Sequence, residues 1–294
     1  MTPPESVRHV LITGASTGIG LACAARMAAD GWHVFAGVRR EADGQALVRE
    51  IGANVTPVTL DVTDERQVAA AADVVRGAVG AAGLHGLVNN AGVVVAGPVE
   101  FVPLADWRRQ FEVNVFGQVA VTQAVLPLLR AARGRIVNVS SISGRLVNPI
   151  VGPYAASKYA LEAINDALRL ELARHGVGVS AVEPGAIDTP IWGKSERAAA
   201  TRSAADGAAR AVYGPEVAAI ERLTRQAAAT AIPAERVADV VAHALGSPRP
   251  RVRYVVGRDA RLGAVAKRLL PDRAFDWLLR RALGLSHDDK KRGA

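Results

Sequence analysis

Short apolar stretches alternate along the chain with longer segments in which apolar residues recur every three or four positions. The short stretches are rich in β-branched residues and predict strands, whereas the longer periodic segments predict helices. The predicted strands are His9–Thr13, His33–Val38, 55–60, Gly86–Asn89, Arg135–Val139, 177–182 and 254–256. The predicted helices are 19–30, 64–79, 104–131, 154–174 and 272–284.

This alternation is typical of right-handed βαβ units, which build a parallel sheet with helices on both faces. We therefore expect an α/β fold, a doubly wound Rossmann-type sheet of about seven strands. The pattern has no break before about residue 248, so we expect one domain over 1–257 and a helical extension over 258–294. Ligands of such sheets bind where the carboxyl ends of the strands meet.

Charge and composition narrow the classes of partner. The net charge is +8, but residues 1–248 carry 23 basic and 23 acidic side chains, against 13 and 5 in residues 249–294. Because the excess lies in the tail, we expect no nucleic-acid partner. Cys23 is the only cysteine, which suits a reducing cytoplasm, and we expect it to be a small buried helix residue. The six histidines have no ligand spacing, so we expect no metal site.

Membrane insertion and secretion are not expected. No apolar run approaches the roughly 20 residues that a membrane-spanning helix needs. Residues 1–8 lack the apolar core of a secretory signal. The sequence therefore predicts a cytoplasmic protein.

A glycine-rich turn follows the first predicted strand and opens the next helix. Its glycines have the spacing Gly-x-x-x-Gly-x-Gly. Glycine allows a tight turn, and the free N–H groups of a helix N-terminus favour an anion such as a pyrophosphate. A purely structural turn is the alternative, but the position between strand and helix favours a nucleotide site. The residues expected there are Gly14, Ser16, Thr17, Gly18, Ile19 and Gly20.

The residues at the end of the second predicted strand indicate whether NAD or NADP is the preferred cofactor. An acidic residue at this place binds the ribose 2′-hydroxyl of NAD, whereas an arginine accommodates the 2′-phosphate of NADP. The strand ends in Val38, Arg39 and Arg40, with no acidic residue before the arginines. We therefore expect NADP(H) to be favoured over NAD(H). The alternative is that one or both arginines are ordinary solvated loop residues.

Three residues form a candidate catalytic group. Tyr154 and Lys158 are four residues apart in a predicted helix, so both lie on one face. A tyrosine with its ordinary pKa of about 10 needs a nearby cation to act as a base near neutrality, and Lys158 can supply it. Ser141 lies thirteen residues before Tyr154, at the end of a predicted strand, where it can hydrogen-bond a substrate oxygen.

These motifs, in this order, resemble the short-chain dehydrogenase/reductase family over roughly residues 7–257. The segments 34–37, 83–88 and 183–185 are most similar to the branch of 17β-hydroxysteroid and retinol dehydrogenases. The resemblance implies that Asn114 is a fourth catalytic residue, whose backbone holds a water in a proton relay to Lys158; the bare residue could equally be structural. It also implies further contacts with the cofactor, two of them from the catalytic residues Tyr154 and Lys158. The residues that it implies are Asp61, Val62, Asn90, Ala91, Gly92, Tyr154, Lys158, Pro184, Gly185, Ile187 and Thr189.

The expected function is therefore an NADP(H)-dependent oxidoreductase that interconverts an alcohol and a carbonyl. The expected substrate walls 93–95, 146–151 and 191–192 are mostly apolar, which suits a bulky steroid-like or retinoid-like substrate. A homodimer or homotetramer is expected. A non-catalytic NADP(H)-binding regulator on the same fold is the alternative, against which the intact Ser141, Tyr154 and Lys158 argue. A sugar epimerase or dehydratase of the extended relatives of this family would carry the glycine motif Gly-x-x-Gly-x-x-Gly, which this sequence lacks.

The basic tail allows two interpretations. Phe275, Leu278, Leu279, Ala282 and Leu283 have the spacing of one helical face. This face could pack on the body of the protein or on a partner subunit. A basic amphipathic helix could instead lie on an anionic membrane surface.

Overall fold

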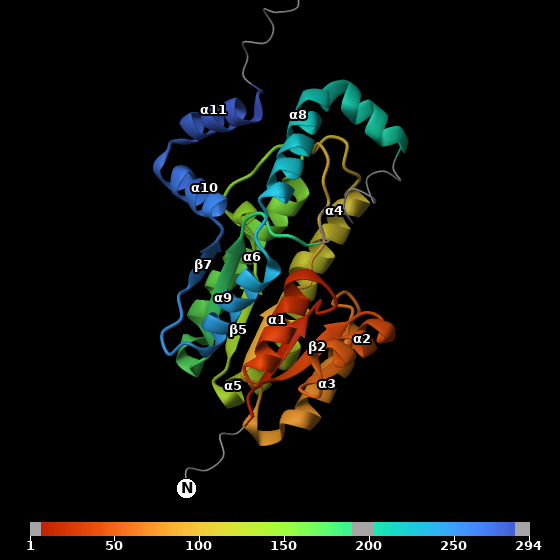
Figure 1. Ribbon diagram of the computed structural model, residues 1–294, viewed down its shortest axis with the longest axis vertical. Coiled ribbons are helices and arrows are strands. Elements are labelled where there is room, and N and C mark those ends of the chain that lie inside the picture. The colour runs from red at the N-terminus through yellow and green to blue at the C-terminus, as the bar shows by residue number, and fades with distance from the viewer. Residues whose placement is uncertain (1–6, 190–202, 286–294) are drawn as a thin grey trace, which may run out of the picture.

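The computed structural model describes residues 7–189 and 203–285. Its centre is a seven-stranded parallel sheet with the order β3-β2-β1-β4-β5-β6-β7 (Figure 1). The strands are β1 (His9–Thr13), β2 (His33–Val38), β3 (Val55–Thr59), β4 (Gly86–Asn89), β5 (Arg135–Val139), β6 (Gly178–Pro184) and β7 (Arg253–Val256). The strand order reverses between β1 and β4, which is the topological switch point of a doubly wound sheet. The expected α/β fold is confirmed.

Helices cover both faces of this sheet, so successive residues of one strand enter different cores. The helices are α1 (Gly18–Ala29), α2 (Glu41–Ile51), α3 (Glu65–Val79), α4 (Leu104–Phe111), α5 (Gly117–Ala132), α6 (Gly152–Leu172), α8 (Ser203–Ala229), α9 (Ala234–Gly246), α10 (Arg258–Leu269) and α11 (Asp272–Leu283). Val10 and Ile12 pack in the core that includes α1 and α9. Leu11, between them, packs in the core that includes α3 and α5. This double burial explains why the strands are continuously apolar.

Among the described helices, α2, α8 and α9 were not predicted, and α10 lies in the extension 258–294, which was expected to be helical, although no bounds were predicted for this helix. In α9, Val237, Val241 and Leu245 are buried at the spacing of one helical face, a signal that could have predicted this helix. The alanine-rich α8 carries few large apolar residues, so its periodicity is faint. In α2, Gly44 and Leu47 are the buried residues, which leaves little pattern to recognise.

The helix predicted over 104–131 is interrupted. Between α4 and α5 lies a π-helical turn, Glu112–Phe116, in which the N–H of Gly117 donates to the carbonyl oxygen of Glu112. The expectation that no apolar segment matches a membrane-spanning helix was also wrong, because Leu104–Ala132 is long and apolar enough by composition. Its α5 part, however, buries Val121, Val125 and Leu129 in the core of the domain.

Candidate active site

The glycine-rich turn joins β1 to α1 at the carboxyl edge of the sheet. Gly14 and Gly18 have φ angles of +65° and +58°, where glycine is favoured. A Cβ on Gly20 would lie 2.2 Å from the carbonyl oxygen of Gly14, so α1 can approach the turn only because this residue is glycine. Thr17, at the N-cap of α1, makes no side-chain capping bond and lines the cleft. The positive end of the helix therefore borders the cleft, where it favours an anion.

Asn90 and Thr13 hold this turn in place. The Asn90 Nδ2 atom donates to the carbonyl oxygens of Thr13 and Gly14 at 2.9 and 3.1 Å. The Thr13 hydroxyl oxygen accepts the backbone N–H groups of Asn90 and Ala91 at 3.0 and 2.9 Å. The side chain of Asn90 thus binds the glycine turn itself, and Thr13, which we had not singled out as a site residue, joins the two loops.

The two arginines after β2 lie in different surroundings. Arg39 lines the cleft, and within residues 7–189 and 203–285 its side chain has no hydrogen-bond or ion-pair partner. Arg40 is not part of the lining. Its Nε and Nη2 atoms donate to the Asp43 carboxylate at 2.9 and 2.7 Å. Of the two, Arg39 alone offers the cleft an unpaired cation.

The loop after β3 contributes Asp61 and Val62 to the cleft. The Asp61 Oδ1 atom accepts the backbone N–H and the hydroxyl of Thr63 at 3.0 and 2.8 Å. The backbone N–H of Asp61 donates to Gln67 Oε1 at 2.8 Å. These bonds fix the loop conformation at the place where the resemblance implies an adenine contact.

Ser141, Tyr154 and Lys158 also line the cleft. Ser141 follows β5 and begins the short 3₁₀ turn Ile142–Gly144. Tyr154 and Lys158 lie one turn apart near the start of α6. All three side chains are buried, and Tyr154 and Ser141 are hydrogen-bonded through their side chains. The arrangement can place a hydroxyl pair against one substrate oxygen.

The protonation of the pair differs from the sequence-based expectation. We expected Lys158 to lower the pKa of Tyr154, but burial raises this pKa, opposed by the hydrogen bond with Ser141. Lys158 Nζ lies 5.8 Å from the centre of the Tyr154 ring and donates to the Val139 carbonyl oxygen at 2.8 Å. Burial lowers the pKa of Lys158 to about 8, while the charge of Glu162 opposes the shift. In this geometry Tyr154 is a neutral hydroxyl and Lys158 can exchange a proton near neutrality.

Asn114 lies fully buried in the π turn between α4 and α5. Its Oδ1 accepts the N–H of Val93 at 2.8 Å, and its Nδ2 donates to the Val93 carbonyl oxygen at 3.0 Å and to Ser157 Oγ at 3.2 Å. The side chain therefore joins the loop after β4 to α6. A π turn departs from the regular helical hydrogen-bond ladder and often marks a functional site.

The end of β6 forms the remaining border of the cleft, with Pro184, Gly185, Ile187 and Thr189 in its lining. The backbone N–H of Ala186 donates to Asp259 Oδ2 at 3.2 Å. A Cβ on Gly185 would lie 2.5 Å from the same oxygen, so only glycine permits this approach. Asp259, in the first turn of α10, is a contributor that sequence reasoning missed.

These elements surround one cleft of about 610 Å³. All the expected site residues line it except Gly20 and Arg40. Of the expected substrate walls, 93–94 line the cleft and 146–151 do not, while 191–192 lie outside the described residues. The lining residues that were predicted neither as site residues nor as substrate walls are Gly37, Val38, Leu60, Thr63, Arg109, Glu112, Val113, Val139 and Ser140. In the described parts of the chain, no group of three or more His, Cys, Asp or Glu side chains could hold a metal.

Comparison with known proteins gives a consistent result. The family model described as short chain dehydrogenase matches residues 8–200. The NADPH-dependent 3-dehydrocapnine reductase of Ornithobacterium rhinotracheale is 37% identical, over 92% of this chain and 95% of that protein. Mouse (Mus musculus) retinol dehydrogenase 16 is 36% identical, over 92% and 87% of the two chains. A short chain dehydrogenase of Burkholderia cenocepacia, crystallised in complex with NADP, superposes with a TM-score of 0.70 at 28% identity, covering 94% of this chain and 97% of that one.

Proposed function

Because the chain belongs to the short-chain dehydrogenase/reductase family and is an NAD(P)-dependent oxidoreductase, we propose that it moves a hydride between NADP(H) and a bulky lipophilic alcohol or ketone. The observation that carries the proposal is the buried group of Ser141, Tyr154 and Lys158, which lines the same cleft as the glycine turn. The proposed catalytic residues are these three together with Asn114.

The chemistry assigns one task to each side chain. The bound nicotinamide supplies or accepts the hydride. In the reductive direction, the neutral Tyr154 hydroxyl donates its proton to the substrate oxygen as negative charge develops there. The Ser141 hydroxyl donates a hydrogen bond to the same oxygen and stabilises that charge. Lys158, with its pKa lowered to about 8, can return a proton to Tyr154, and Asn114 keeps the adjoining loop in place.

NADP(H) is the proposed cofactor. Arg39 lines the cleft as a cation without a partner among the described side chains, and no acidic residue precedes it in β2. A guanidinium of this kind forms charge-assisted hydrogen bonds with a 2′-phosphate. One relative is named for its dependence on NADPH, and a structural neighbour was crystallised with NADP, which supports the proposal.

The experiment that tests this function follows NADPH oxidation and NADP reduction by absorbance against steroids, retinoids and small ketones. We expect turnover with at least one bulky lipophilic member, and its loss in Tyr154→Phe. Tight NADP(H) binding with no turnover across the panel would favour the alternative, a non-catalytic regulator on the same fold.

We further propose that the extension 258–294 contacts an anionic membrane surface. In the structure α11 buries Phe275 and Leu283, and Arg222 Nη2 of α8 donates to the Leu283 carbonyl oxygen at 2.7 Å. Packing on the body therefore accounts for part of the face expected over 272–284. α11 still exposes Trp277 and Leu278, but the most exposed apolar residues of the extension lie on α10, where Leu262 and Leu269 are each 73% exposed.

The outer face of α10 has the composition of an interfacial helix. Leu262, Val265 and Leu269 are exposed and lie at i, i+3 and i+7, so they form one stripe. Arg261 and Arg268 are exposed along one flank of this stripe. Apolar residues beside arginines complement an anionic bilayer, whereas a second copy would present the same positive charge.

Vesicle co-sedimentation tests this contact. Wild-type protein should bind anionic vesicles at low salt and dissociate as salt rises, because the ionic part of the attraction is screened. The double variant Leu262→Ser/Leu269→Ser should lose binding, whereas Leu170→Ser, at an equally exposed leucine of α6, should not. Failure of the wild type to bind at low salt would contradict the membrane proposal and leave the enzymatic proposal intact.

A further inference from the structure

A cluster of ion pairs outside the cleft lining contains a carboxylate with no exposed surface. Glu183, on β6, directly precedes Pro184 and Gly185 of the cleft lining, but is not itself part of it. Arg145 Nη2 donates to Glu183 Oε1 at 2.8 Å, and Arg145 Nε lies 2.6 Å from Oε2, an ion-pair contact without hydrogen-bond geometry. Arg145 comes directly after the 3₁₀ turn that begins at Ser141, so the pair connects the catalytic serine loop to the end of β6.

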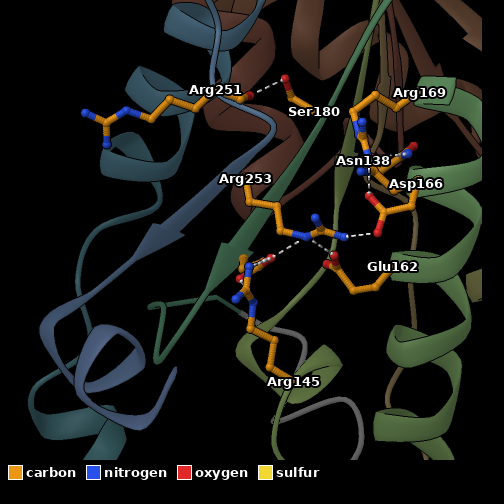
Figure 2. Close-up of polar contacts among 10 residues, drawn as sticks. Asn138, Arg145, Glu162, Asp166, Arg169, Ser180, Arg251 and Arg253 are labelled. Atoms are coloured by element: carbon orange, nitrogen blue, oxygen red, sulfur yellow. Dashed lines mark hydrogen bonds and ion pairs between the residues drawn. The ribbon is translucent and has the colours of Figure 1, made fainter. Parts of the chain in front are cut away.

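A second arginine extends the cluster to α6 (Figure 2). Arg253, on β7, donates from Nε to Glu162 Oε2 at 2.9 Å and from Nη2 to Asp166 Oδ2 at 2.7 Å, and its Nε lies 3.5 Å from Glu183 Oε1. Glu162 is one helical turn beyond Lys158. Arg169 also pairs with Asp166, at 3.2 Å. Three arginines therefore balance three carboxylates.

The connections run to the segments that carry Ser141 and Lys158. Besides its side-chain pair, Arg145 accepts a hydrogen bond at its backbone carbonyl from the Tyr159 hydroxyl of α6. The serine loop is therefore joined to α6 and to β6 at one residue. Arg253 joins α6 to β6 and β7 from the other side.

Stability alone is a weak explanation for such a cluster. Moving a carboxylate out of water is costly, and buried ion pairs can often be replaced by apolar side chains without loss of stability. Burial accordingly raises the pKa of Glu183, and the two arginines oppose that shift. What an apolar core cannot provide is the directional contact of a planar guanidinium with a carboxylate.

We propose that Glu183 is a positioning residue: through Arg145 and Arg253 it holds the Ser141 loop, the Lys158 turn of α6 and the Pro184–Gly185 end of β6 in register for hydride transfer. The proposal rests on the proposed function, since it takes Ser141 and Lys158 as catalytic. Glu183 does not touch the cleft, so it acts through the backbone segments that it joins.

Turnover and cofactor fluorescence test the proposal in the full-length protein, measured well below the unfolding temperature of every variant. Glu183→Gln keeps the shape of the side chain and removes its charge. We expect kcat to fall at least about tenfold with the Kd for NADPH changed less than about threefold, because within the described residues the cluster makes no contact with the glycine turn or Arg39. The fluorescence enhancement of the nicotinamide of bound NADPH should decrease as well.

Three further variants separate positioning from a general loss of structure. Arg145→Lys keeps the charge but replaces the planar guanidinium, which lies against both carboxylate oxygens, so it should give an intermediate kcat. Arg145→Met combined with Glu183→Gln should cost no more in kcat than the worse single variant, because the two residues act as a unit. Arg26→Met removes an exposed ion pair between α1 and α9, far from the cluster, and should leave kcat unchanged.

A folded Glu183→Gln protein with a lower melting temperature but unchanged kcat and nicotinamide fluorescence would overturn the proposal. The cluster would then be only structural. A wild type without turnover would instead count against the proposed function; in that case the nicotinamide fluorescence of Glu183→Gln still decides whether the residue positions the cofactor-binding wall.

Discussion

Replacement of Arg39 by alanine should weaken NADPH binding and leave NADH binding almost unchanged. Arg39 is exposed, lines the cleft and has no partner within the described residues, so its removal breaks no internal bond. A hydrogen bond to a charged group contributes about 1.5–3 kcal/mol, which corresponds to about 10-fold to 150-fold in Kd. Because the side chain is solvated, we expect the lower end at physiological ionic strength.

The assay is titration of protein with NADPH and with NADH, followed by nicotinamide fluorescence at two salt concentrations. The difference between the cofactors should shrink as salt rises, because a phosphate–guanidinium contact at the surface is screened. NADH lacks the 2′-phosphate, so its Kd should change less than about twofold on the same substitution.

Arg40 supplies a matched control. Its guanidinium is bound to Asp43, so the double variant Arg40→Ala/Asp43→Ala removes a pair without net charge. This variant should change the Kd of NADPH less than about threefold, in keeping with the small effect of exposed ion pairs. If Arg39→Ala weakened NADPH and NADH binding equally, the reasoning would be refuted and Arg39 would have a structural role. If the double variant lost as much NADPH affinity as Arg39→Ala, both arginines would bind the 2′-phosphate.

Three other outcomes follow from the site. Tyr154→Phe should reduce kcat at least about 100-fold and leave the Kd for NADPH within a few-fold of the wild type, because the ring still packs but the proton donor is lost. Appreciable activity in a folded variant would show that Tyr154 is not the proton donor. The pKa of Lys158 is lowered from 10.5 to about 8, so between these pH values the unfolded chain binds a proton that the folded protein has lost. The free energy of unfolding should therefore rise by about 3 kcal/mol from pH 8 to pH 10.5, relative to Lys158→Met. Urea unfolding in which the difference between the two proteins does not change with pH would contradict this prediction. Gly20→Ala should abolish cofactor binding in fluorescence titrations, because its Cβ would lie 2.2 Å from the Gly14 carbonyl oxygen. The control Gly77→Ala, with open space around it in α3, should bind the cofactor normally and have a higher melting temperature than the wild type.

Local sequence patterns determined the fold class and the order of the motifs. Buried parallel strands are continuous apolar runs, so β1 and β2 were visible in the sequence with the bounds that the structure has. The glycine spacing after β1 reflects a backbone requirement at Gly14 and Gly18 that no other residue meets easily. The spacing of Tyr154 and Lys158 on one helix face is also local, which is why the sequence indicates their juxtaposition.

Tertiary structure alone decided which polar groups face the cleft and which face one another. Arg39 and Arg40 are neighbours in the sequence, but Asp43 at the start of α2 binds one of them and leaves the other to the cleft. Asn90 matched a cofactor motif, yet its amide holds the glycine turn. Glu183 and Arg253 lie seventy residues apart and meet because β6 and β7 pair in register. Periodicity reports burial along one element, whereas ion pairs and pKa values depend on the elements that the fold brings beside it.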